Sequence, residues 1–233
     1  GFLCQTAQMA NEFANKFGIS MDRTFILPPI IPSETVFEKR IRDNGGERVK
    51  IGYSGKFDQS WGIYEMIETC EELIARGMEI ELHVIGGKFN RGPNGKSSFV
   101  KEIRGIFERK EWIIWHGAKP RLEAAEIMSD VDIAWCFRPS SLEENTLEIS
   151  TKILEAINMK LPVIAFPNSA NKGLLGDLSP FLARDVEGCV EAVSAILDKY
   201  EHFSSLVDDV DLEKFKSAEI GRSLVDFLPK KKK

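Results

Sequence analysis

The sequence predicts an α/β protein with a doubly wound parallel sheet of about six strands. Beyond residue 47, short apolar segments without strict alternation of apolar and polar residues recur, and a single helical segment separates each from the next. Strands without alternation are buried on both faces, which is typical of a parallel sheet covered by helices. Because parallel crossovers are right-handed, we expect the helices to divide between the two faces.

The expected strands and helices alternate along the chain. In the first helix, for example, Ile63, Met66 and Ile67 follow helical spacing, and Gly77 ends the pattern. The expected strands are 48–55, 79–87, 112–117, 131–137, 161–166 and 180–183, and the expected helices are 61–76, 98–109, 121–129, one that begins near residue 150, and 185–198.

The two ends of the chain have a different pattern. Residues 1–18 are expected to form one amphipathic helix, and residues 201–228 one or two helices. The proline-rich segment 25–33 cannot be a central strand, so we expect a short edge element that runs into an interdomain linker. Because the sequence starts at Gly1 without an initiator Met, we expect an amino-terminal part to precede it.

The composition argues against several function classes. A net charge of −5 disfavours a nucleic-acid-binding protein, because such proteins need a basic face. No apolar run approaches the roughly 18 residues that span a membrane. Cys70, Cys136 and Cys189 sit in apolar patterns, so we expect buried thiols in a reducing compartment, the cytoplasm. Spacing assembles neither a metal-ligating cluster nor a Ser/His/Asp set.

The residues just after each strand are the first place to look for a site, because doubly wound sheets bind ligands beyond the carboxyl ends of their strands. After the first strand, Gly55 allows a close turn of the backbone, and Lys56 is a cation beside a helix start. Backbone N–H groups at a helix start already favour an anion. The alternative is an ordinary junction between strand and helix with a surface lysine.

The loop after the fourth strand, RPSSLEENTLEISTK, is long and polar, and such loops in compact domains tend to be functional. Ser150 or Thr151 can cap the next helix or hold a phosphate. Lys152 would add a positive charge, and Glu155 could accept hydrogen bonds from a ribose diol. The alternative is a capped helix in which Lys152 and Glu155 form a surface ion pair worth about 0.3 kcal/mol.

One further segment imitates a phosphate-binding loop. Residues 90–98, NRGPNGKSS, end like a Walker A motif. The motif requires Gly where the chain has Asn90, and Pro93 removes a backbone donor from the cradle. A surface loop is therefore the favoured interpretation.

Several segments taken together carry a resemblance to a known family. In chain order they are GYSGKFDQSWGIYEMIETCEEL, LHVIGG, IIWHG, SDVDIAW and STKILEAINMKLPVIAF. Their order and approximate spacing resemble the carboxy-terminal domain of the group 1 glycosyltransferases, over about residues 20–200. These are retaining enzymes with the two-domain GT-B fold. The resemblance implies that the sheet is Rossmann-like and forms the carboxy-terminal half of such a fold.

The resemblance also implies a division of the chain. Residues 1–46 would be the end of a missing amino-terminal domain plus a linker, and residues 47–200 a Rossmann-like domain that binds a nucleotide sugar. Residues 201–233 would be carboxy-terminal helices and a basic tail. The missing domain would bind the acceptor. The lysines at 230–233 would either attract anionic lipid weakly or form a disordered solubilising end.

For the donor, the resemblance implies that Gly55 and Lys56 contact the diphosphate and that Lys56 acts in catalysis. Gly117 would begin the loop that receives the base, and Glu155 would hold the ribose. The positive end of the helix at Ser150 and Thr151 would stabilise the charge that develops on the departing nucleoside diphosphate.

At two positions the sequence departs from the family pattern. A second basic residue normally precedes Gly62, where this chain has Trp61, and we expect Lys152 to substitute for it. The acid that faces the sugar would fall on Leu147, so Glu148, one residue along, is expected to take the catalytic role.

The resemblance implies a metal-independent hexosyltransferase without a cofactor, whose donor is a UDP-, GDP- or ADP-sugar and whose acceptor is a glycan or a lipid-linked molecule. Family habit suggests polysaccharide biosynthesis in the cytoplasm, either free or peripheral to the membrane, and no transfer by the isolated chain. Two other interpretations stay open. The chain could be a non-catalytic nucleotide-sugar-binding or scaffolding relative, which Trp61 and Leu147 favour, or a nucleotide-sugar epimerase.

Overall fold

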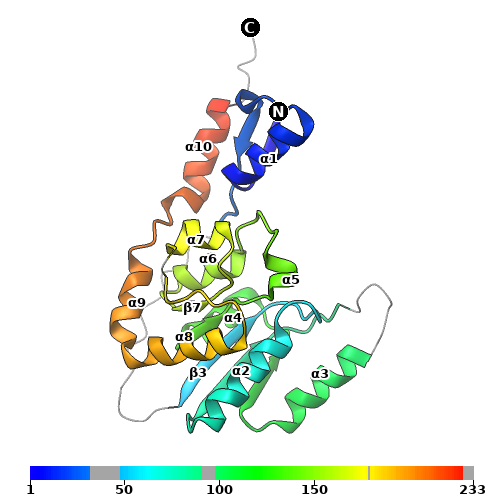
Figure 1. Cartoon of the computed structure of the whole chain (residues 1–233), viewed down its shortest axis with the longest axis vertical. Helices are drawn as coiled ribbons and strands as arrows, with labels where there is room; N and C mark the ends of the chain where they lie inside the picture. The colour runs from blue at the N-terminus through cyan, green and yellow to red at the C-terminus, as the bar shows by residue number, and fades with distance from the viewer. Residues whose placement is uncertain (32–47, 91–97, 178, 228–233) are drawn as a thin grey trace.

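The computed structural model describes residues 1–31, 48–90, 98–177 and 179–227. Its centre is a five-stranded parallel sheet in the order β5-β4-β3-β6-β7 (Figure 1). The strands are β3 (Val49–Ser54), β4 (Ile80–Ile85), β5 (Ile113–Gly117), β6 (Ile133–Trp135) and β7 (Val163–Ile164). This order is that of a doubly wound sheet, so the predicted fold class is confirmed. The chain reverses its direction of travel across the sheet between β3 and β6, where such folds bind ligands.

The predicted sixth strand, 180–183, is reduced to one residue pair. Leu182 forms an isolated parallel bridge with Ala165, although it extends the sheet at the expected edge. The neighbouring residues explain the short pairing. Pro180 lies in a turn, and Asp185 already caps the next helix by accepting a hydrogen bond from the N–H of Gly188. Too few residues remain between turn and helix for a longer strand.

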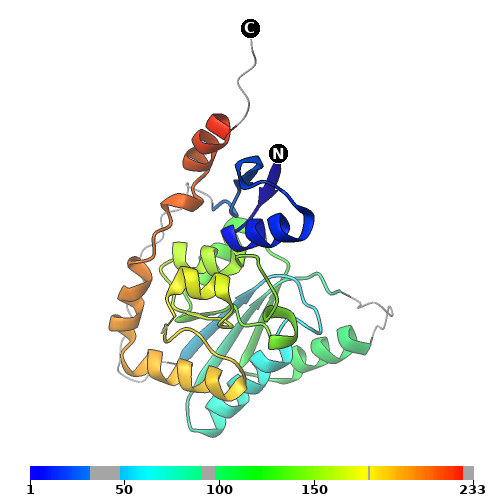
Figure 2. The same cartoon turned by 45° about the horizontal axis from the view of Figure 1, so that its top comes forward.

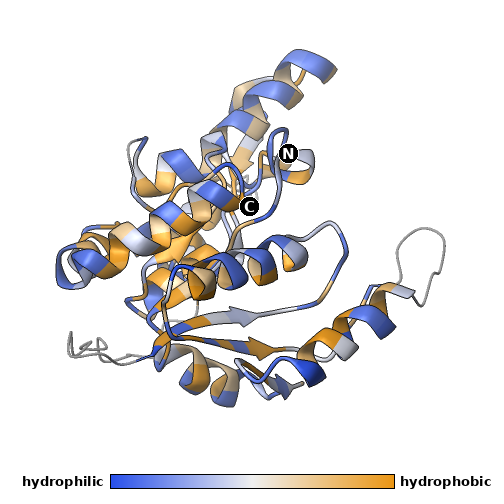
Figure 3. Cartoon of the chain, turned by 60° about the horizontal axis from the view of Figure 1, so that its bottom comes forward, coloured by the Kyte–Doolittle hydropathy of each residue, from blue (hydrophilic) through white to orange (hydrophobic). Residues whose placement is uncertain are grey.

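Helices cover both faces of the sheet, as Figure 3 shows in a view along its layers. On one face α2 (Ile63–Ala75) packs against α8 (Val186–Asp198), and on the other α4 (Arg121–Ser129) lies over β3 and β4. The remaining helices of this part are α3 (Ser98–Arg109), α5 (Ser140–Glu143), α6 (Thr151–Asn158) and α7 (Ser169–Leu175). The stripe predicted for α2 is buried in the core, so helical spacing located its inner face correctly.

The amino-terminal segment does not form the single helix expected for residues 1–18. It contains β1 (Phe2–Cys4), α1 (Ala7–Phe17), the 3-10 turn η1 (Met21–Arg23) and β2 (Thr24–Ile26), and β1 pairs with β2 in parallel. Thr6 sets the helix start, because its side chain accepts a hydrogen bond from the N–H of Met9. The apolar residues before Thr6 are therefore free to form a strand.

The carboxy-terminal segment returns to this amino-terminal unit, as the views in Figures 1 and 2 agree. It contains α9 (Tyr200–Asp208), the turn η2 (Glu213–Phe215) and α10 (Ser217–Phe227), so the expectation of one or two helices is confirmed. The ring of Phe227 lies 5.2 Å from that of Phe25. Ile31 also forms a parallel bridge with Lys216. The linker expected to follow the segment 25–33 and the basic tail at 230–233 lie outside the described residues.

Gly62 brings the start of α2 into contact with the end of β6. It is the residue before the helix and has a positive φ of 77°. A Cβ atom at this position would lie 2.5 Å from the carbonyl oxygen of Phe137 and 3.3 Å from Cα of Arg138. A side chain would therefore push apart the two segments that meet where β3 and β6 diverge.

We predict that Gly62→Ala lowers the free energy of unfolding by about 3 kcal/mol. The strain of a left-handed backbone, about 1–2 kcal/mol, adds to the cost of displacing the backbone after β6. Gly77→Ala is the matched control, because Gly77 also has a positive φ, of 88°, but nothing lies within 4 Å of the position that a Cβ atom would occupy there. Urea unfolding of both variants measures the difference, and equal losses would contradict the contact.

Candidate functional site

The turn after β3 is held in place by hydrogen bonds from two neighbouring groups. The N–H of Gly55 donates to the carbonyl of Ile85 at 2.9 Å. The hydroxyl of Tyr53 donates to the carbonyl of Lys56. Because burial raises the pKa of Tyr53, this hydroxyl keeps its proton and remains a donor. The exposed side chain of Lys56 thus leaves a fixed backbone at the carboxyl edge of the sheet.

Lys152 folds back from α6 over this turn. Its Nζ lies 5.7 Å from the ring centroid of Tyr53 and 5.4 Å from that of Trp61, within the range of cation–π contacts. Its Cε would be 2.7 Å from a Cβ at Gly55, so this lysine side chain would have to shift if Gly55 carried a side chain. Lys152 therefore lies over Trp61, at the place where the family pattern has a basic residue.

The surroundings of Lys152 disfavour its positive charge. Burial is the largest cause of a lowered pKa, and the positive charges of Arg138 and Lys56 act in the same direction. The nearby Cys136 and Glu155 partly oppose this effect. A cation that is half-buried among other cations is a favourable place for an anion to bind, because an anion removes the repulsion.

The start of α6 adds its backbone N–H groups to these cations. Ser150 is the residue before the helix, but its side chain makes no capping hydrogen bond, which differs from the capping that the sequence allows. The N–H groups of a first helical turn have no partners within the helix. The cavity at this point is only about 10 Å³ and is lined by Tyr53, Trp61, Cys136, Phe137, Arg138, Ser150 and Lys152. The folded-back Lys152 side chain fills most of the space.

A larger cavity of about 400 Å³ lies between α4 and α6. Its volume is within the range of small-molecule sites. Its walls are mainly apolar and its charged groups are few; the lining includes Arg121, Ala125, Met128, Cys136, Lys152 and Glu155. It adjoins the small cavity, because Cys136 and Lys152 line both.

Glu155 does not pair with Lys152 in the way that the surface-pair interpretation requires. Its Oε1 instead lies 3.3 Å from Nη2 of Arg121, in the first turn of α4. Both side chains are well exposed, at 68% for Arg121 and 47% for Glu155, so the pair contributes little to stability. Glu155 therefore remains at the edge of the larger cavity, where a ligand hydroxyl can replace the arginine.

Two further predicted site residues, Gly117 and Glu148, line neither of these two cavities in the described part of the chain. Gly117 ends β5 with a positive φ of 67°, and its carbonyl accepts a hydrogen bond from Gly86 at 2.8 Å. It leads directly toward α4 at the same edge of the sheet. Glu148 is exposed in the segment before α6, and within the described residues it lines neither cavity. The adjacent carbonyl of Leu147 accepts a hydrogen bond from the Thr6 hydroxyl at 2.8 Å.

Three charged residues of the site were not singled out from the sequence. Arg138 lies three residues after the end of β6, directly after the predicted strand 131–137, and lines the small cavity. Glu143, in α5, is buried and forms an ion pair with Arg138. Arg121 begins α4 and pairs with Glu155. The place of Arg138, immediately after the fourth strand, is the signal that could have identified it, because Lys56 was selected by the same rule.

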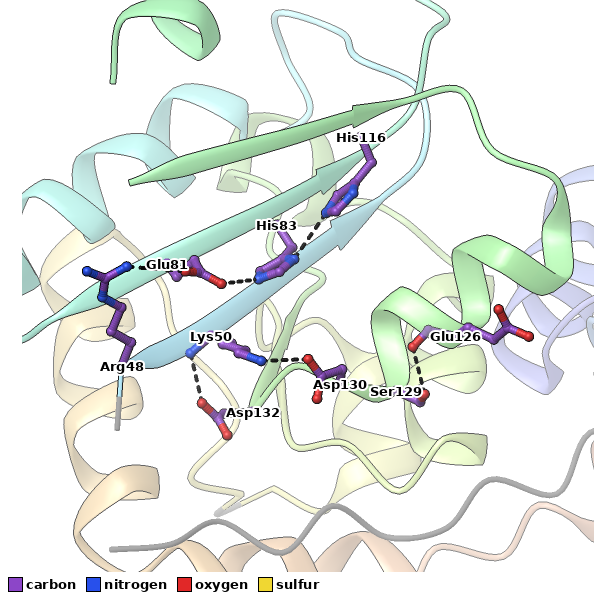
Figure 4. A network of polar contacts seen from close by, with 9 residues as sticks. All are labelled: Arg48, Lys50, Glu81, His83, His116, Glu126, Ser129, Asp130 and Asp132. Carbon is purple, nitrogen blue, oxygen red and sulfur yellow. Dashed lines mark hydrogen bonds and ion pairs between the residues drawn. The ribbon is translucent and has the colours of Figure 1, made fainter. Parts of the chain in front are cut away.

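The histidines form a separate polar chain, shown in Figure 4. Nδ1 of His83 lies 3.1 Å from Nε2 of His116, and Nε2 of His83 lies 2.7 Å from Oε1 of Glu81. Burial and the neighbouring His83 lower the pKa of His116. These contacts of His83 and His116 join β4 to β5, so the two histidines have a structural role. Among the described residues, no group of three or more His, Cys, Asp or Glu side chains is placed to hold a metal ion.

Comparison with known proteins gives the family. The family model described as Glycosyl transferases group 1 matches residues 48–199, more than half of the chain. The chain belongs to the group 1 glycosyltransferases. No curated protein sequence matches this glycosyltransferase chain significantly. In the part of the chain that the structure describes, every helix is too short or too polar to cross a bilayer.

Three solved structures share the fold of this glycosyltransferase chain. HepE from Anabaena, in complex with UDP, has a TM-score of 0.73 at 11% identity, with 96% of this chain and 62% of that chain covered. The pneumococcal O-GlcNAc transferase GtfA, in complex with UDP and GlcNAc, has a TM-score of 0.71 at 13% identity, with 98% and 45% covered. The lipopolysaccharide outer core galactosyltransferase WaaB, in its apo form, has a TM-score of 0.62 at 14% identity, with 97% and 60% covered.

At these identities the likeness concerns the fold, and it matches the GT-B fold expected from the sequence. The chain spans 62% of the HepE chain, 60% of the WaaB chain and 45% of the GtfA chain. The three structures therefore contain a large part that has no counterpart in this glycosyltransferase chain.

We predict that Lys152→Met stabilises the ligand-free chain by about 1 kcal/mol at neutral pH, because an apolar side chain replaces a cation that is partly desolvated among like charges. A lowered pKa means that folded Lys152 loses its proton at a lower pH than the unfolded chain does. Between the lowered pKa of folded Lys152 and 10.5, the ordinary lysine value, the free energy of unfolding of the parent chain should therefore rise with pH. The advantage of the variant should shrink as the pH approaches 10.5.

Thermal unfolding between pH 7 and pH 10 measures this effect. Lys172→Met is the control, because Lys172 lies in α7 and its Nζ forms an exposed pair with Asp177 at 3.3 Å. We expect that variant to change stability by less than about 0.5 kcal/mol. A loss of stability in Lys152→Met at neutral pH would show that the charge of Lys152 is compensated.

Proposed function

We propose that this chain binds the nucleoside diphosphate of a UDP-, GDP- or ADP-sugar and that the whole enzyme transfers a hexosyl group from it. The observation that carries the proposal is the position of Lys152. Its Nζ lies against Gly55 and over Trp61, beside Lys56 and the start of α6. Two cations and a helix amino terminus thus meet at the point where doubly wound sheets bind phosphates.

The cavity between α4 and α6 is the proposed place for the nucleoside. Its apolar walls suit the faces of a base, and its volume of about 400 Å³ is adequate. Glu155 would accept hydrogen bonds from the ribose after leaving Arg121, and the backbone after Gly117 would approach the base. The diphosphate would then extend past Cys136 toward Lys152, Ser150 and Thr151.

The proposed chemistry is retaining transfer without a metal. Departure of the nucleoside diphosphate builds negative charge on its oxygens, and Lys56, Lys152 and the N–H groups of the first turn of α6 stabilise that charge. By analogy with the oxyanion holes of other enzymes, removing one such donor should raise the barrier by about 2.7–4 kcal/mol. We assign the acid that faces the sugar to Glu148. The closeness of this residue to Ser150 along the chain supports the assignment.

The solved relatives support UDP as the first donor to test. HepE has been crystallised with UDP and with UDP-glucose, and GtfA with UDP and GlcNAc. The acceptor, a glycan or a lipid-linked molecule, would bind mainly through a domain outside this chain. We place the enzyme in polysaccharide biosynthesis, in the cytoplasm or weakly associated with a membrane surface.

A non-catalytic relative is the second candidate, and one observation favours it. In this structure Lys152 covers Trp61 and fills the space at the start of α6, while Glu155 is paired with Arg121. A pocket that no longer binds a donor would look the same. Donor hydrolysis or transfer by the full-length protein excludes this candidate, and analysis of the product, glycoside or free epimer, excludes an epimerase.

We predict that one of UDP, GDP and ADP binds this chain in a calorimetric titration. Lys56→Ala should weaken the binding about tenfold, the effect of losing about 1.4 kcal/mol from a charged contact. Glu155→Ala should weaken it about fivefold, by loss of the ribose contact. Glu126→Ala is the control, because this exposed residue of α4 lies outside the cavity lining. The proposal fails if none of the three nucleotides binds at millimolar concentration.

We predict further that the full-length protein forms a glycoside with the anomeric configuration of its donor, and that EDTA leaves the rate unchanged. The first follows from the retaining mechanism, and the second from stabilisation of the leaving group by lysines and helix N–H groups. Proton NMR of the product gives the configuration. An inverted anomer or a rate that EDTA abolishes would contradict this mechanism. The isolated chain should show no transfer.

A further inference from the structure

Arg138 is a positive residue at the centre of the candidate site, and its backbone is fixed there. It follows β6 and lies against the start of α2, because Gly62 has no Cβ to keep the two segments apart. Together with Ser150 and Lys152 it lines the small cavity at the start of α6. The backbone therefore brings an arginine to the cavity that Lys152 also lines.

A buried acid holds this arginine. Glu143 is 3% exposed. Its Oε1 pairs with Nη2 of Arg138, and its Oε2 accepts a hydrogen bond from Nδ2 of Asn168. Asn168 is itself fixed, because its Oδ1 caps α7 by accepting a hydrogen bond from the N–H of Asn171 at 2.7 Å. The carboxylate thus connects α5, α7 and the end of β6.

The guanidinium of Arg138 retains unused donors toward the cavity. An arginine side chain has five N–H donors, and the ion pair with Glu143 takes one nitrogen. The side chain is 26% exposed, whereas that of Glu143 is 4% exposed. The acid is therefore enclosed, and the arginine is the member of the pair that a ligand can reach.

The charges around Arg138 explain why a buried acid is needed. Lys152 lines the same cavity, and the positive charges of Arg138 and Lys56 are among the causes of its lowered pKa. Without Glu143, Cys136 and Glu155 would compensate these three positive charges only in part in the ligand-free chain. With Glu143 in place, the arginine is held against this repulsion and stays ready for an anion.

We propose that Arg138 is a third cation that binds the donor diphosphate, and that Glu143 is the positioning residue that holds it there. This inference rests on the proposed function. It adds a contact that selects a diphosphate over a monophosphate, because three cations and a helix amino terminus exceed what one phosphate group can engage.

The test is calorimetric titration of the chain with UDP, GDP and ADP and with the matching monophosphates. For the nucleotide that binds, Arg138→Gln should weaken diphosphate binding about tenfold and monophosphate binding less than about twofold. Glu143→Gln, which keeps the shape of the acid, should weaken diphosphate binding about threefold, because the arginine loses its orientation. Arg222→Gln in exposed α10 is the control and should change neither affinity.

A single substitution leaves one buried charge unpaired and could unfold the chain, so the double variant Arg138→Gln/Glu143→Gln is included. If the double variant is folded and its ratio of diphosphate to monophosphate affinity falls by about fivefold or more, the proposal holds. If Arg138→Gln or the double variant binds the diphosphate as tightly as the parent does, the pair is structural and the inference is wrong. If no nucleotide binds the parent, the proposed function itself fails.

Discussion

Parallel pairing of β3 with β6 is the constraint on which the rest of the site depends. The register sets Ile51 opposite Ile133 and Gly52 opposite Ala134. The chain leaves β3 toward α2 on one face and reaches β6 from α4 on the other. The loops after β3 and β6 therefore diverge at the carboxyl edge of the sheet. Lys56 and Arg138 lie on these loops, and Lys152 lies beside them. Gly52 allows close packing there, since a Cβ would lie 2.9 Å from the side chains of Met128 and Val131.

Electrostatics then determines what this edge can bind. Lys56 comes from the turn after β3, Arg138 from the end of β6, and Lys152 from the start of α6, so distant segments supply the same charge. Proteins rarely gather like charges at a half-buried point unless a partner compensates them. Glu143 compensates one of the three from inside. The remaining positive charge favours an anion over a neutral ligand at this edge, which is the basis of the diphosphate site proposed above.

The sequence predicted the order of strands and helices because the signals involved are local. Apolar spacing in α2 and the absence of alternation in β3 and β4 depend only on neighbours along the chain. The strand Phe2–Cys4 was missed because a strand of three residues exists only through its partner, Thr24–Ile26. The bridge at Leu182 was overestimated for the opposite reason, since a turn and a helix cap limit it from both sides.

The site was predictable in its outline and not in its pairings. Lys56 and Lys152 could be selected because each follows a strand or begins a helix, and Glu155 because it lies one turn further along the same helix as Lys152. The partners of these residues depend on tertiary contacts: Arg121 reaches Glu155 only because α4 and α6 flank one cavity. In the same way, the sequence alone shows Glu143 as a polar loop residue, and only the folded structure shows its hydrogen bond from Asn168, the residue before α7. The local sequence pattern thus shows where charged residues lie along the chain, whereas tertiary packing determines which of them form pairs.

Two hydrogen bonds that join the described residues of the amino-terminal unit to the sheet domain have a mechanical consequence. The Thr6 hydroxyl holds the carbonyl of Leu147 at 2.8 Å, and the Ser169 hydroxyl donates to Gln8 at 2.6 Å. One end of α1 is thus attached to the peptide that enters α6 and to the first turn of α7. If α1 tilts, either both hydrogen bonds break or the backbone at Leu147 and Ser169 moves with the helix. A rigid-body movement of the amino-terminal unit would therefore displace the segments that begin α6 and α7.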